Sequence, residues 1–586
     1  MNSNWNLDKL YKGFDDPNFS TDFKELPAVV TELVDFAKDN FASTENTGEK
    51  LATYIQKMQA FSAYYNILRF CSLTTSTDSE NQEALKYMSQ AQLILSEGVV
   101  ASTLFTEFVG KIDDLEAIIA ASDLLKEHEF FLLETKRNGQ YLLSTPEEVI
   151  AAKLRITGST AWNTLYSQLT STLEIDFDHP DFDNPQTLSE IRNLAYHADA
   201  DVRKAAYHAE LAAYPKIEKS VAAALNAIKG EAITNTKLRG YDSILDMTLK
   251  NSRMDQETLD ALIDTMKQSL PLFTKYFKHK ASKLGLKDGL PFYDLFAPIG
   301  ESNVTFTKEE GSDFMIKNFT DFDPELGEFA RSAIDQDWVD WEPKKGKVGG
   351  AFCANLHNIK ESRVLMNYSG SFGDVLTLAH EFGHAYHGYA LKDESSLNSG
   401  YSMPIAEVAS IFCETLVCNA ALKTATDEEK LSIIETNLQG SSQVIVDIYS
   451  RYLFETELIK CRETGNLSVD ELSDIMANAQ REAYLDGLTE EIHPYMWLCK
   501  GHYYSAGLGF YNFPYAYGLL FAKGLYKMYL DEGPSFAKKY KDLLTATGKN
   551  DLYTVGKIVG IDIHDKNFWQ GAIDVIADEI EMFLSL

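Results

Sequence analysis

The segment TLAHEFGHAYHG, residues 377 to 388, contains three histidines and one glutamate, although the whole chain has only 12 histidines. His380 and His384 are four residues apart in a stretch without proline, so on a helix both imidazoles project from one face. Two neutral imidazoles in this arrangement can hold one zinc ion, and Glu381 beside them can handle the proton of a water. The pattern HEFGH therefore predicts a catalytic metal site, and the alternative is a pair of histidines packed within a helix.

A catalytic zinc ion needs a third protein ligand and one open position for water. The pattern HExxHxxGxxH is excluded, because the position of its third histidine is Ala390. The apolar run MPIAEVASIFCETL contains Glu407 and Glu414, seven residues apart, and carboxylates in such a helix need cationic partners. We predict that Glu407 is the third ligand and that Glu414 orients one of the histidines. An ordinary buried ion pair is the alternative for Glu414.

Two further positions in the same helix invite interpretation. His387 lies three residues after His384, so it either borders the site and faces substrate, or packs and hydrogen-bonds in the core. Gly383 costs the helix about 1 kcal/mol relative to alanine, which predicts that a neighbouring helix approaches closely at this point. Zinc is inferred from the type of ligand, and another divalent metal would suit the same residues.

Hydrolysis at a metal also needs a hydrogen-bond donor for the oxyanion that develops on the attacked carbonyl. The downstream run GHYYSAGLGFYNFPYAYGLL, residues 501 to 520, interleaves tyrosines with glycines after His502. We predict that this group contributes to the site, with His502 and Tyr511 as the leading donors. For any single tyrosine, packing in the core is the alternative.

The elements that must position these residues are mainly helical. Most of the first 265 residues repeat apolar side chains at spacings of three and four, as amphipathic helices do. Residues 286 to 374 are rich in glycine, proline and short β-prone runs such as SRVLMNYS, which predicts a small sheet directly before the histidine-bearing helix. The helical period then continues to the end, so the predicted fold is mainly α with a small β insert.

A soft boundary is predicted in DFDHPDFDNPQTLSE, residues 176 to 190, where proline and aspartate cluster before the possible helix caps Thr187 and Ser189. It divides the chain into an N-terminal helical lobe, residues 1–185, and a catalytic domain, residues 186–586. With 586 residues, the chain has enough volume for a large core in each.

Composition restricts the partners that we expect. The net charge of −33 argues against binding of nucleic acid or of an anionic membrane surface. No secretory signal is visible at the N-terminus, and no run of eighteen apolar residues lacks a charge. The 6 cysteines form no CxxC pair, which is typical of reduced thiols. We therefore expect a cytoplasmic protein without nucleic-acid or membrane partners, of unknown oligomeric state.

Several strings resemble the M3 metallopeptidases, and within them the oligoendopeptidase F branch. They are GKVGGAFC, SRVLMNYSGSFGDVLTLAHEFGHAYH, MPIAEVASIFCETL and FYNFPYAYG, and the resemblance covers nearly the whole chain. It implies a two-lobed, mainly helical, gluzincin-like fold with a small sheet beside the active-site helix. It also implies a deep substrate channel with one zinc ion on its floor.

The resemblance assigns roles residue by residue. The zinc ligands of the family match His380, His384 and Glu407. Its catalytic base matches Glu381, and its residues that contact the substrate or the oxyanion match His502 and Tyr511. A further family tyrosine is replaced by Leu519 after Gly518, so Tyr515 or Tyr517 is a candidate to substitute for it. The strand around GGAFC is expected to pair with the substrate backbone.

The predicted activity is hydrolysis of internal bonds in short unstructured oligopeptides, with zinc-bound water attacking and Glu381 as general base. A near alternative is a dipeptidyl carboxypeptidase with the same chemistry. That activity needs a cation for the terminal carboxylate of the substrate, and the sequence identifies none. A distant alternative is a non-catalytic peptide-binding zinc protein, but structural zinc sites usually have four ligands and favour cysteine.

Overall fold

Many helices of this chain begin at residues whose side chains cap them. In the computed structural model, which describes residues 2–287, 289–300 and 305–586, Thr187 caps α11 (Leu188–Asn193), as the sequence predicted. Its hydroxyl accepts the backbone N–H of Glu190, whose carboxylate accepts the N–H of Thr187 in return. The same reciprocal pattern occurs at Ser144, Thr307, Ser371, Thr426 and Ser468. Local side-chain chemistry thus fixes where these helices start.

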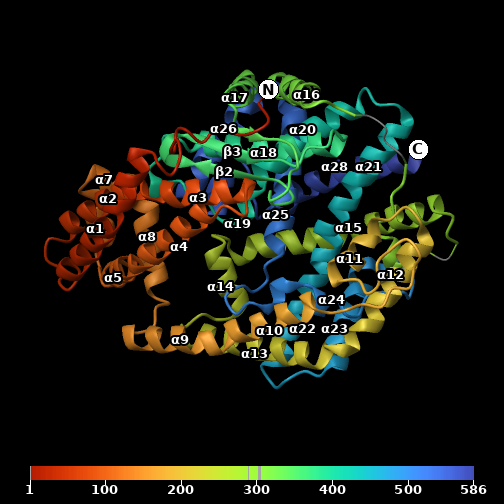
Figure 1. Ribbon diagram of the computed structural model, residues 1–586, viewed down its shortest axis with the longest axis horizontal. Coiled ribbons are helices and arrows are strands. Elements are labelled where there is room, and N and C mark those ends of the chain that lie inside the picture. The colour runs from red at the N-terminus through yellow and green to blue at the C-terminus, as the bar shows by residue number, and fades with distance from the viewer. Residues whose placement is uncertain (1, 288, 301–304) are drawn as a thin grey trace. The chain divides into compact units, whose positions relative to one another are not determined.

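The chain folds into two compact units, each assembled from three stretches of sequence. Unit 1 comprises Met1–Leu142, Val304–Ala420 and Met528–Ile561, and unit 2 comprises Leu143–Asn303, Ala421–Lys527 and Asp562–Leu586. The lobe boundary predicted at residue 185 falls inside unit 2 and stays a prediction. The mainly helical fold with a small sheet is confirmed (Figure 1).

Unit 1 begins with a bundle of short amphipathic helices and ends with helices that carry the histidine-rich segment. Its helices are α1 (Pro17–Asn40), α2 (Thr47–Ser62), α3 (Tyr65–Thr77), α4 (Gln82–Glu97), α5 (Val99–Gly110), α6 (Leu115–Ala120), α7 (Asp123–Glu127), α8 (Glu129–Gly139), α16 (Lys308–Phe322), α17 (Pro324–Asp335), α18 (Phe372–Ala390), α19 (Met403–Ala406), α20 (Val408–Leu422, the last two residues in unit 2), α26 (Phe536–Ala546) and α27 (Leu552–Ile558).

The sheet of unit 1 has three strands in the order β1-β3-β2. The strand β1 (Val339–Asp340) runs parallel to β3 (Glu361–Leu365), and β2 (Phe352–Leu356) runs antiparallel to β3 with Phe352 opposite Leu365. Within the predicted β region, residues 288 and 301–304 lie outside the described part. The run SRVLMNYS supplies most of β3, so the predicted small sheet is confirmed, and β2 forms one of its edges.

The sheet lies between two helical layers of unit 1. Phe352 and Ala354 of β2 pack against the apolar core of the N-terminal helices, which includes Leu26, Leu51 and Ile55. Asn355, on the opposite face of the same strand, donates a hydrogen bond from Nδ2 to the backbone oxygen of His384 on α18, at 3.2 Å. The alternation of β2 therefore fastens the histidine-bearing helix to the N-terminal bundle.

Unit 2 is helical around a polar as well as an apolar core. Its helices are α9 (Thr145–Thr157), α10 (Ser159–Ser171), α11, α12 (Ala200–Ala213), α13 (Glu218–Leu238), α14 (Ile244–Asn251), α15 (Gln256–Lys283), α21 (Asp427–Ser442), α22 (Ile448–Arg462), α23 (Val469–Tyr484), α24 (Met496–Cys499), α25 (Phe513–Glu532, the last residues in unit 1) and α28 (Lys566–Ser585).

A group of polar residues in unit 2, which we call the Glu210 cluster, consists of the buried Glu210, His493 and Tyr214 and the partly exposed Arg192. Arg192 and Tyr214 donate to Glu210 Oε1, both at 2.5 Å, and His493 Nε2 lies 3.1 Å from the same oxygen. Burial on its own raises the pKa of Glu210, but the charges of His493 and Arg192 lower it to about 2. The carboxylate is thus held in its charged form inside the protein.

Two stretches are long and apolar enough to cross a membrane by length and composition. They are Gln82–Gly110, whose apolar window is 28% buried, and Met403–Leu422, whose window is 61% buried. The core helix of a soluble protein passes the same test, and Met403–Leu422 carries Glu407 and Glu414. The expectation that no membrane is involved stays a prediction.

Candidate metal centre and active site

The helix α18 is fixed at its start by a network around Ser371. Its hydroxyl accepts the N–H of Asp374 at 3.1 Å, and Asp374 Oδ2 accepts the N–H of Ser371 at 2.9 Å. The same carboxylate oxygen accepts two further hydrogen bonds from Ser369, at 2.8 and 3.0 Å. This network sets the first residue of α18, and the helical period then places His380 and His384 on one face, one turn apart.

The three predicted metal ligands come together. The ligating atoms of His380, His384 and Glu407 all lie within 4.8 Å of one another. Glu407 Oε2 is 3.2 Å from His380 Nε2 and 3.4 Å from His384 Nε2. Their side chains are 27%, 18% and 24% exposed in the order His380, His384 and Glu407, so one side of the group stays open to water. Two imidazoles, one carboxylate and an open side fit a catalytic metal ion of the zinc type.

The side chains around the metal position shift one another's pKa values. Although burial disfavours the charged imidazole, hydrogen bonds to Glu407 and Glu414 raise the pKa of His380 to about 10. Burial likewise opposes ionisation of Glu407, but hydrogen bonds from His380 and His384 lower the pKa of its carboxyl. The carboxylates of Glu407 and Glu414 thus favour positive charge at the position between these side chains.

Two residues, Glu414 and Ser410, form hydrogen bonds with the predicted metal ligands. Glu414 Oε2 lies 3.1 Å from His380 Nδ1, so it accepts the proton of that nitrogen and leaves Nε2 to face the metal position. The hydroxyl of Ser410 lies 2.9 Å from Glu407 Oε2. The position predicted for Glu414 agrees with this geometry, whereas Ser410 was not anticipated, because a serine in an apolar run gives no signal of its own.

Glu381 directly follows His380 in α18 and is buried. It is only 6% exposed, and burial raises the pKa of its carboxyl. Burial, and then the charge of Glu381, raise the pKa of the Cys353 thiol on β2. A carboxyl with a raised pKa next to a metal position has the properties of a general base.

Two glycines of α18 allow its neighbours to approach. A Cβ atom on Gly383 would lie 2.4 Å from the backbone oxygen of Ala409 and 2.5 Å from Ser410 Cα, both on α20. The predicted close approach of a helix at Gly383 is thus confirmed. A Cβ atom on Gly388 would lie 2.3 Å from Asn355 Oδ1 on β2, so the strand and helix also touch there.

His387 belongs to the core of unit 1. It is fully buried, its Nε2 lies 2.8 Å from the hydroxyl of Thr547, and its ring stacks on Tyr401 at 4.0 Å. Burial lowers its pKa to about 3. Of the two interpretations left open by the sequence, the structure favours the packed one.

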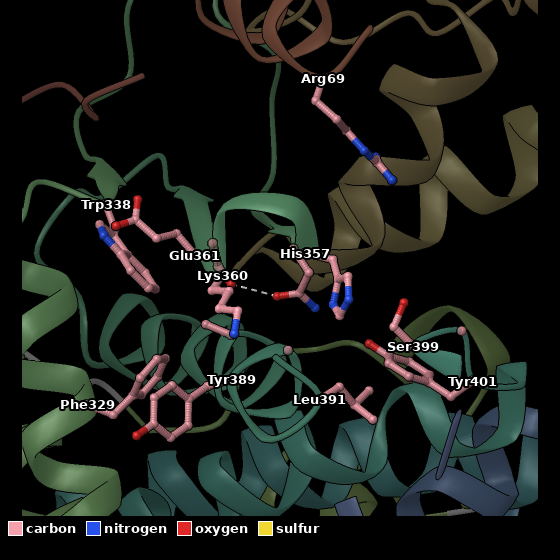
Figure 2. A pocket seen from close by; sticks show the side chains of 15 residues that line it. Arg69, Phe329, Trp338, His357, Lys360, Glu361, Tyr389, Leu391, Ser399 and Tyr401 are labelled. Atoms are coloured by element: carbon pink, nitrogen blue, oxygen red, sulfur yellow. Dashed lines mark hydrogen bonds between the residues drawn. The ribbon is translucent and has the colours of Figure 1, made fainter. Parts of the chain in front are cut away.

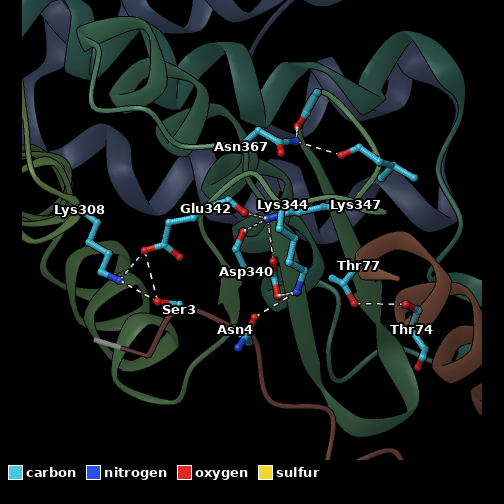
Figure 3. Close-up of polar contacts among 12 residues, drawn as sticks. Ser3, Asn4, Thr74, Thr77, Lys308, Asp340, Glu342, Lys344, Lys347 and Asn367 are labelled. Carbon is cyan, nitrogen blue, oxygen red and sulfur yellow. Dashed lines mark hydrogen bonds and ion pairs between the residues drawn. The ribbon is translucent and has the colours of Figure 1, made fainter. Parts of the chain in front are cut away.

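The loop that leads into β2 is held at two points (Figure 3). Lys347, whose side chain is 0% exposed, forms an ion pair with Asp340 at 2.6 Å and donates to the backbone oxygen of Glu342 at 2.9 Å. Asn367, just after β3, donates to the backbone oxygens of Val348 and Gly350 at 3.0 and 2.7 Å. Within the described residues, the outer edge of β2 pairs with no strand, so its backbone groups are free for an extended peptide.

A cavity of about 370 Å³ lies along the C-terminal half of α18, bordered by the turn His357–Ile359 between β2 and β3. Figure 2 shows Arg69 extending toward it from α3 and Tyr401 on the opposite side. Lys360 also lines it and forms an ion pair with Asp393 at 2.7 Å, whereas Arg69 forms no ion pair with any described residue. The α18 residues of its lining are Ala385, Gly388 and Tyr389.

The downstream candidates form their own group in unit 2. The rings of His502 and Tyr511 lie 6.0 Å apart, and the hydroxyls of Tyr511 and Tyr515 lie 2.9 Å apart. Tyr517 is separate, because it is fully buried in α25 with its ring stacked on Phe521 at 5.3 Å. Of the two candidates to substitute for the missing family tyrosine, Tyr515 lies beside Tyr511 and Tyr517 packs in the core, and the choice between them as a donor stays a prediction. Leu519 is buried in the same helix.

The residue that contacts His502 was not predicted from the sequence. Asn512 Nδ2 lies 2.8 Å from His502 Nε2, and Arg451 donates to Asn512 Oδ1 at 3.3 Å. Asn512 lies within FYNFPYAYG, where the tyrosines were predicted to be the functional residues. Asn512 has no sequence feature that indicates a function, because its contact with His502 forms only in the folded protein.

Comparison with known proteins identifies the class of protein that this fold and site define. The model of peptidase family M3 matches residues 193–575, and the model named Oligopeptidase F matches residues 111–175. The chain belongs to peptidase family M3, in its oligopeptidase F branch, and is a peptidase. The resemblance drawn from its motifs is thereby confirmed.

Relatives of similar length support this assignment. Oligopeptidase PepF of Bacillus subtilis is 23% identical over 588 residues, covering 98% of this chain and 86% of that protein. An oligoendopeptidase F homolog of Lactococcus lactis subsp. lactis is 23% identical over 595 residues, covering 98% of this chain and 96% of that protein.

Solved structures share the fold. A crystal structure from Chlamydophila abortus has a TM-score of 0.85 at 22% identity and covers 100% of this chain and 98% of that chain. The crystal structure of oligoendopeptidase-F from Enterococcus faecium has a TM-score of 0.71 at 18% identity and covers 97% of this chain and 99% of that chain.

Proposed function

We propose that this protein is a zinc-dependent endopeptidase that hydrolyses internal bonds of short, unstructured oligopeptides. The observation that carries the proposal is the convergence of His380, His384 and Glu407, whose ligating atoms lie within 4.8 Å of one another beside the buried Glu381. The donor set would hold one zinc ion per chain. Zinc, when bound, supplies a Lewis acid that polarises the attacked carbonyl and lowers the pKa of water.

In this proposal, side chains of the protein transfer the proton and stabilise the charge that develops on the substrate. Glu381 accepts a proton from the attacking water and delivers it to the nitrogen of the leaving peptide. His502 and Tyr511, with Tyr515 hydrogen-bonded to Tyr511, donate hydrogen bonds to the oxyanion of the substrate. Glu414 holds His380 in the orientation that ligation needs.

Substrate recognition is proposed to occur at the edge of the sheet. An extended peptide can add to the free edge of β2 through backbone hydrogen bonds, which give affinity with little dependence on side chains. We further propose that the protein works in the cytoplasm without nucleic-acid or membrane partners. The net charge of −33 and six cysteines that are all free thiols support this.

A pair of substitutions tests the central assignment. Glu381→Gln is expected to retain bound zinc and to lose activity by at least about 10²-fold, because the proton acceptor is gone. Glu407→Ala is expected to lose zinc. Elemental analysis gives the metal content, and mass spectrometry of a ladder of peptide lengths gives the cleavage, with and without chelator. Glu116→Gln on the exposed face of α6 is the matched control. Undiminished cleavage by a zinc-loaded Glu381→Gln protein would rule out the general-base assignment.

The dipeptidyl carboxypeptidase alternative now has a residue to test. Release of C-terminal dipeptides needs a cation for the terminal carboxylate, and Arg69 lines the cavity along α18 without an ion pair to any described residue. If the alternative holds, Arg69→Met will raise KM for peptides with a free carboxylate and leave C-terminally amidated peptides unaffected. Cleavage of doubly blocked peptides at internal bonds, with no effect of Arg69→Met, supports the endopeptidase.

A further inference from the structure

The imidazole of His502 is in contact with a side-chain amide. His502 lies in the short helix Gly501–Tyr504, and Asn512 lies directly before α25. Asn512 Nδ2 is 2.8 Å from His502 Nε2, and Asn512 is only 7% exposed. His502 is half-buried, so the contact is partly buried, and the protonation of Nε2 depends on which end of the amide faces it.

The orientation of the amide is set by an arginine. Arg451 donates from a terminal nitrogen to Asn512 Oδ1 at 3.3 Å, and a guanidinium has no acceptor. The oxygen of the amide must therefore face Arg451 and its NH₂ group must face His502. Arg451 is itself held by an ion pair with the buried Asp447, which also lies within reach of the Tyr484 hydroxyl, at 3.5 Å. Four side chains thus form a chain of contacts that ends at the imidazole.

An NH₂ group can only donate, so His502 Nε2 must accept and carries no proton. The ring then holds its single proton on Nδ1. Within the described residues, the hydrogen bond of the His502 ring is the one at Nε2, so the N–H at Nδ1 can be donated to a ligand. Burial, and then the charges of Arg451, Lys500 and Lys229, lower the pKa of His502 to about 3, which agrees with a neutral ring.

We propose that Asn512 is a positioning residue that fixes His502 as the neutral Nδ1–H tautomer and thereby makes it a hydrogen-bond donor to the substrate at every working pH. The inference rests on the proposed function in one respect, namely that His502 contacts the substrate. A neutral donor suits a site that must stabilise an oxyanion without taking a second proton itself.

The first test reads the tautomer directly and needs no activity. Two-bond ¹H–¹⁵N correlation spectra of the full-length protein with ¹⁵N-labelled histidine separate the Nδ1–H and Nε2–H forms. The spectrum of His502→Gln assigns the signal. We expect the Nδ1–H form in the unmodified protein from about pH 5.5 to 8.5, without titration.

Asn512→Asp reverses the contact without changing its shape. A carboxylate accepts but cannot donate, so it draws a proton to Nε2 and strips Nδ1 of its proton whenever the ring is neutral. Arg451 faces the new carboxylate as well, which compensates the added charge. We expect His502 of this variant to be in the Nε2–H form at high pH and to titrate between about pH 5 and 8. The positive charges of Arg451, Lys500 and Lys229 oppose protonation of the ring and keep its pKa from rising further.

The second test follows the pH profile of peptide cleavage. Asn512→Asp is expected to lose kcat as pH rises through the new ionisation, by about 10- to 100-fold at pH 8.5, with little change in KM. The profile of the unmodified protein should lack this limb. Asn512→Ala should give a mixture of tautomers and an intermediate kcat. Asn550→Asp is the control and should resemble the unmodified protein, because among the described residues the amide of Asn550 donates to the backbone oxygen of Ala546.

Each outcome decides one statement. A His502 signal that stays in the Nδ1–H form in Asn512→Asp, or an Nε2–H signal in the unmodified protein, overturns the inference. A pH profile unchanged by Asn512→Asp despite the tautomer switch overturns the role of His502 as a donor. If the unmodified protein cleaves no peptide, the proposed function fails, and the spectra still decide the tautomer.

Discussion

The close approach of α18 and α20 at Gly383 leads to a prediction about metal binding. In Gly383→Ala, the added methyl group would lie 2.4 Å from the backbone oxygen of Ala409 and 2.5 Å from Ser410 Cα. Ordinary contacts of a Cβ atom begin near 3.4 Å, so the helices must move apart by about 1 Å. Both opposing atoms belong to the backbone, so no side chain can rotate away to absorb the strain.

This separation acts on the metal site, because α18 carries two ligands and the junction of α19 and α20 carries the third. Overpacking costs about 3 kcal/mol at the upper end of its usual range, and the gain in helix propensity from glycine to alanine returns about 1 kcal/mol. About 2 kcal/mol of strain therefore remains. Relief by parting the ligands weakens zinc binding by about 10- to 100-fold, the range typical of disturbed ligand orientation.

Competition with a chromophoric chelator measures the zinc affinity, and thermal unfolding with and without zinc measures how much the metal stabilises the fold. Gly373→Ala is the matched control within the same helix, since its methyl group would meet only Ser371 Oγ at 3.5 Å. We expect the control to bind zinc as the unmodified protein does. Unchanged zinc affinity and unfolding temperature in Gly383→Ala would refute the link between the contact of the two helices and metal binding.

Three further perturbations have defined outcomes. Glu414→Ala frees the Nδ1–H of His380 and should weaken zinc binding about 10- to 100-fold in the chelator assay, whereas Glu414→Gln keeps an acceptor and should lose less. The Glu210 cluster should stabilise the fold above the ordinary carboxyl pKa of 4.5 and lose on the order of 3 kcal/mol as pH falls toward 2, while Glu210→Gln removes this dependence in urea unfolding. Lys347→Met leaves the buried Asp340 with Lys344 at 4.0 Å as its cation in place of Lys347 at 2.6 Å, and should destabilise the fold by about 3 kcal/mol, with partial recovery when Asp340→Asn is added.

Much of the candidate site was accessible from the sequence, because its chemistry depends on spacing along one helix. The separation of His380 and His384 by four residues is enough to place both on one face, and the sequence neighbour Glu381 follows automatically. Gly383 could be assigned to a close contact because a glycine inside a helix lowers the stability of the helix, and close packing can offset this loss. These inferences depend on local geometry, which the α-helix fixes wherever it lies in the fold.

Contacts between distant segments could not be predicted with the same certainty. Glu407 and Glu414 were candidates through their charge in an apolar run, but only the packing of α20 on α18 shows that Glu407 reaches both histidines and that Glu414 reaches His380 Nδ1. For His387, helical spacing left two roles open, and its burial against Thr547 favours one.

The sequence by itself therefore determined the helical class, the small sheet, the metal-binding pattern and the family, because each is written in residue types at fixed spacing. Tertiary structure decided which edge of the sheet is free, which tyrosine pairs with Tyr511, and how Arg451 and Asn512 orient the ring of His502. The physical reason is that hydrogen bonds between side chains far apart in the chain depend on the position and direction of single atoms. Periodicity constrains the face of an element, and packing alone constrains what that face meets.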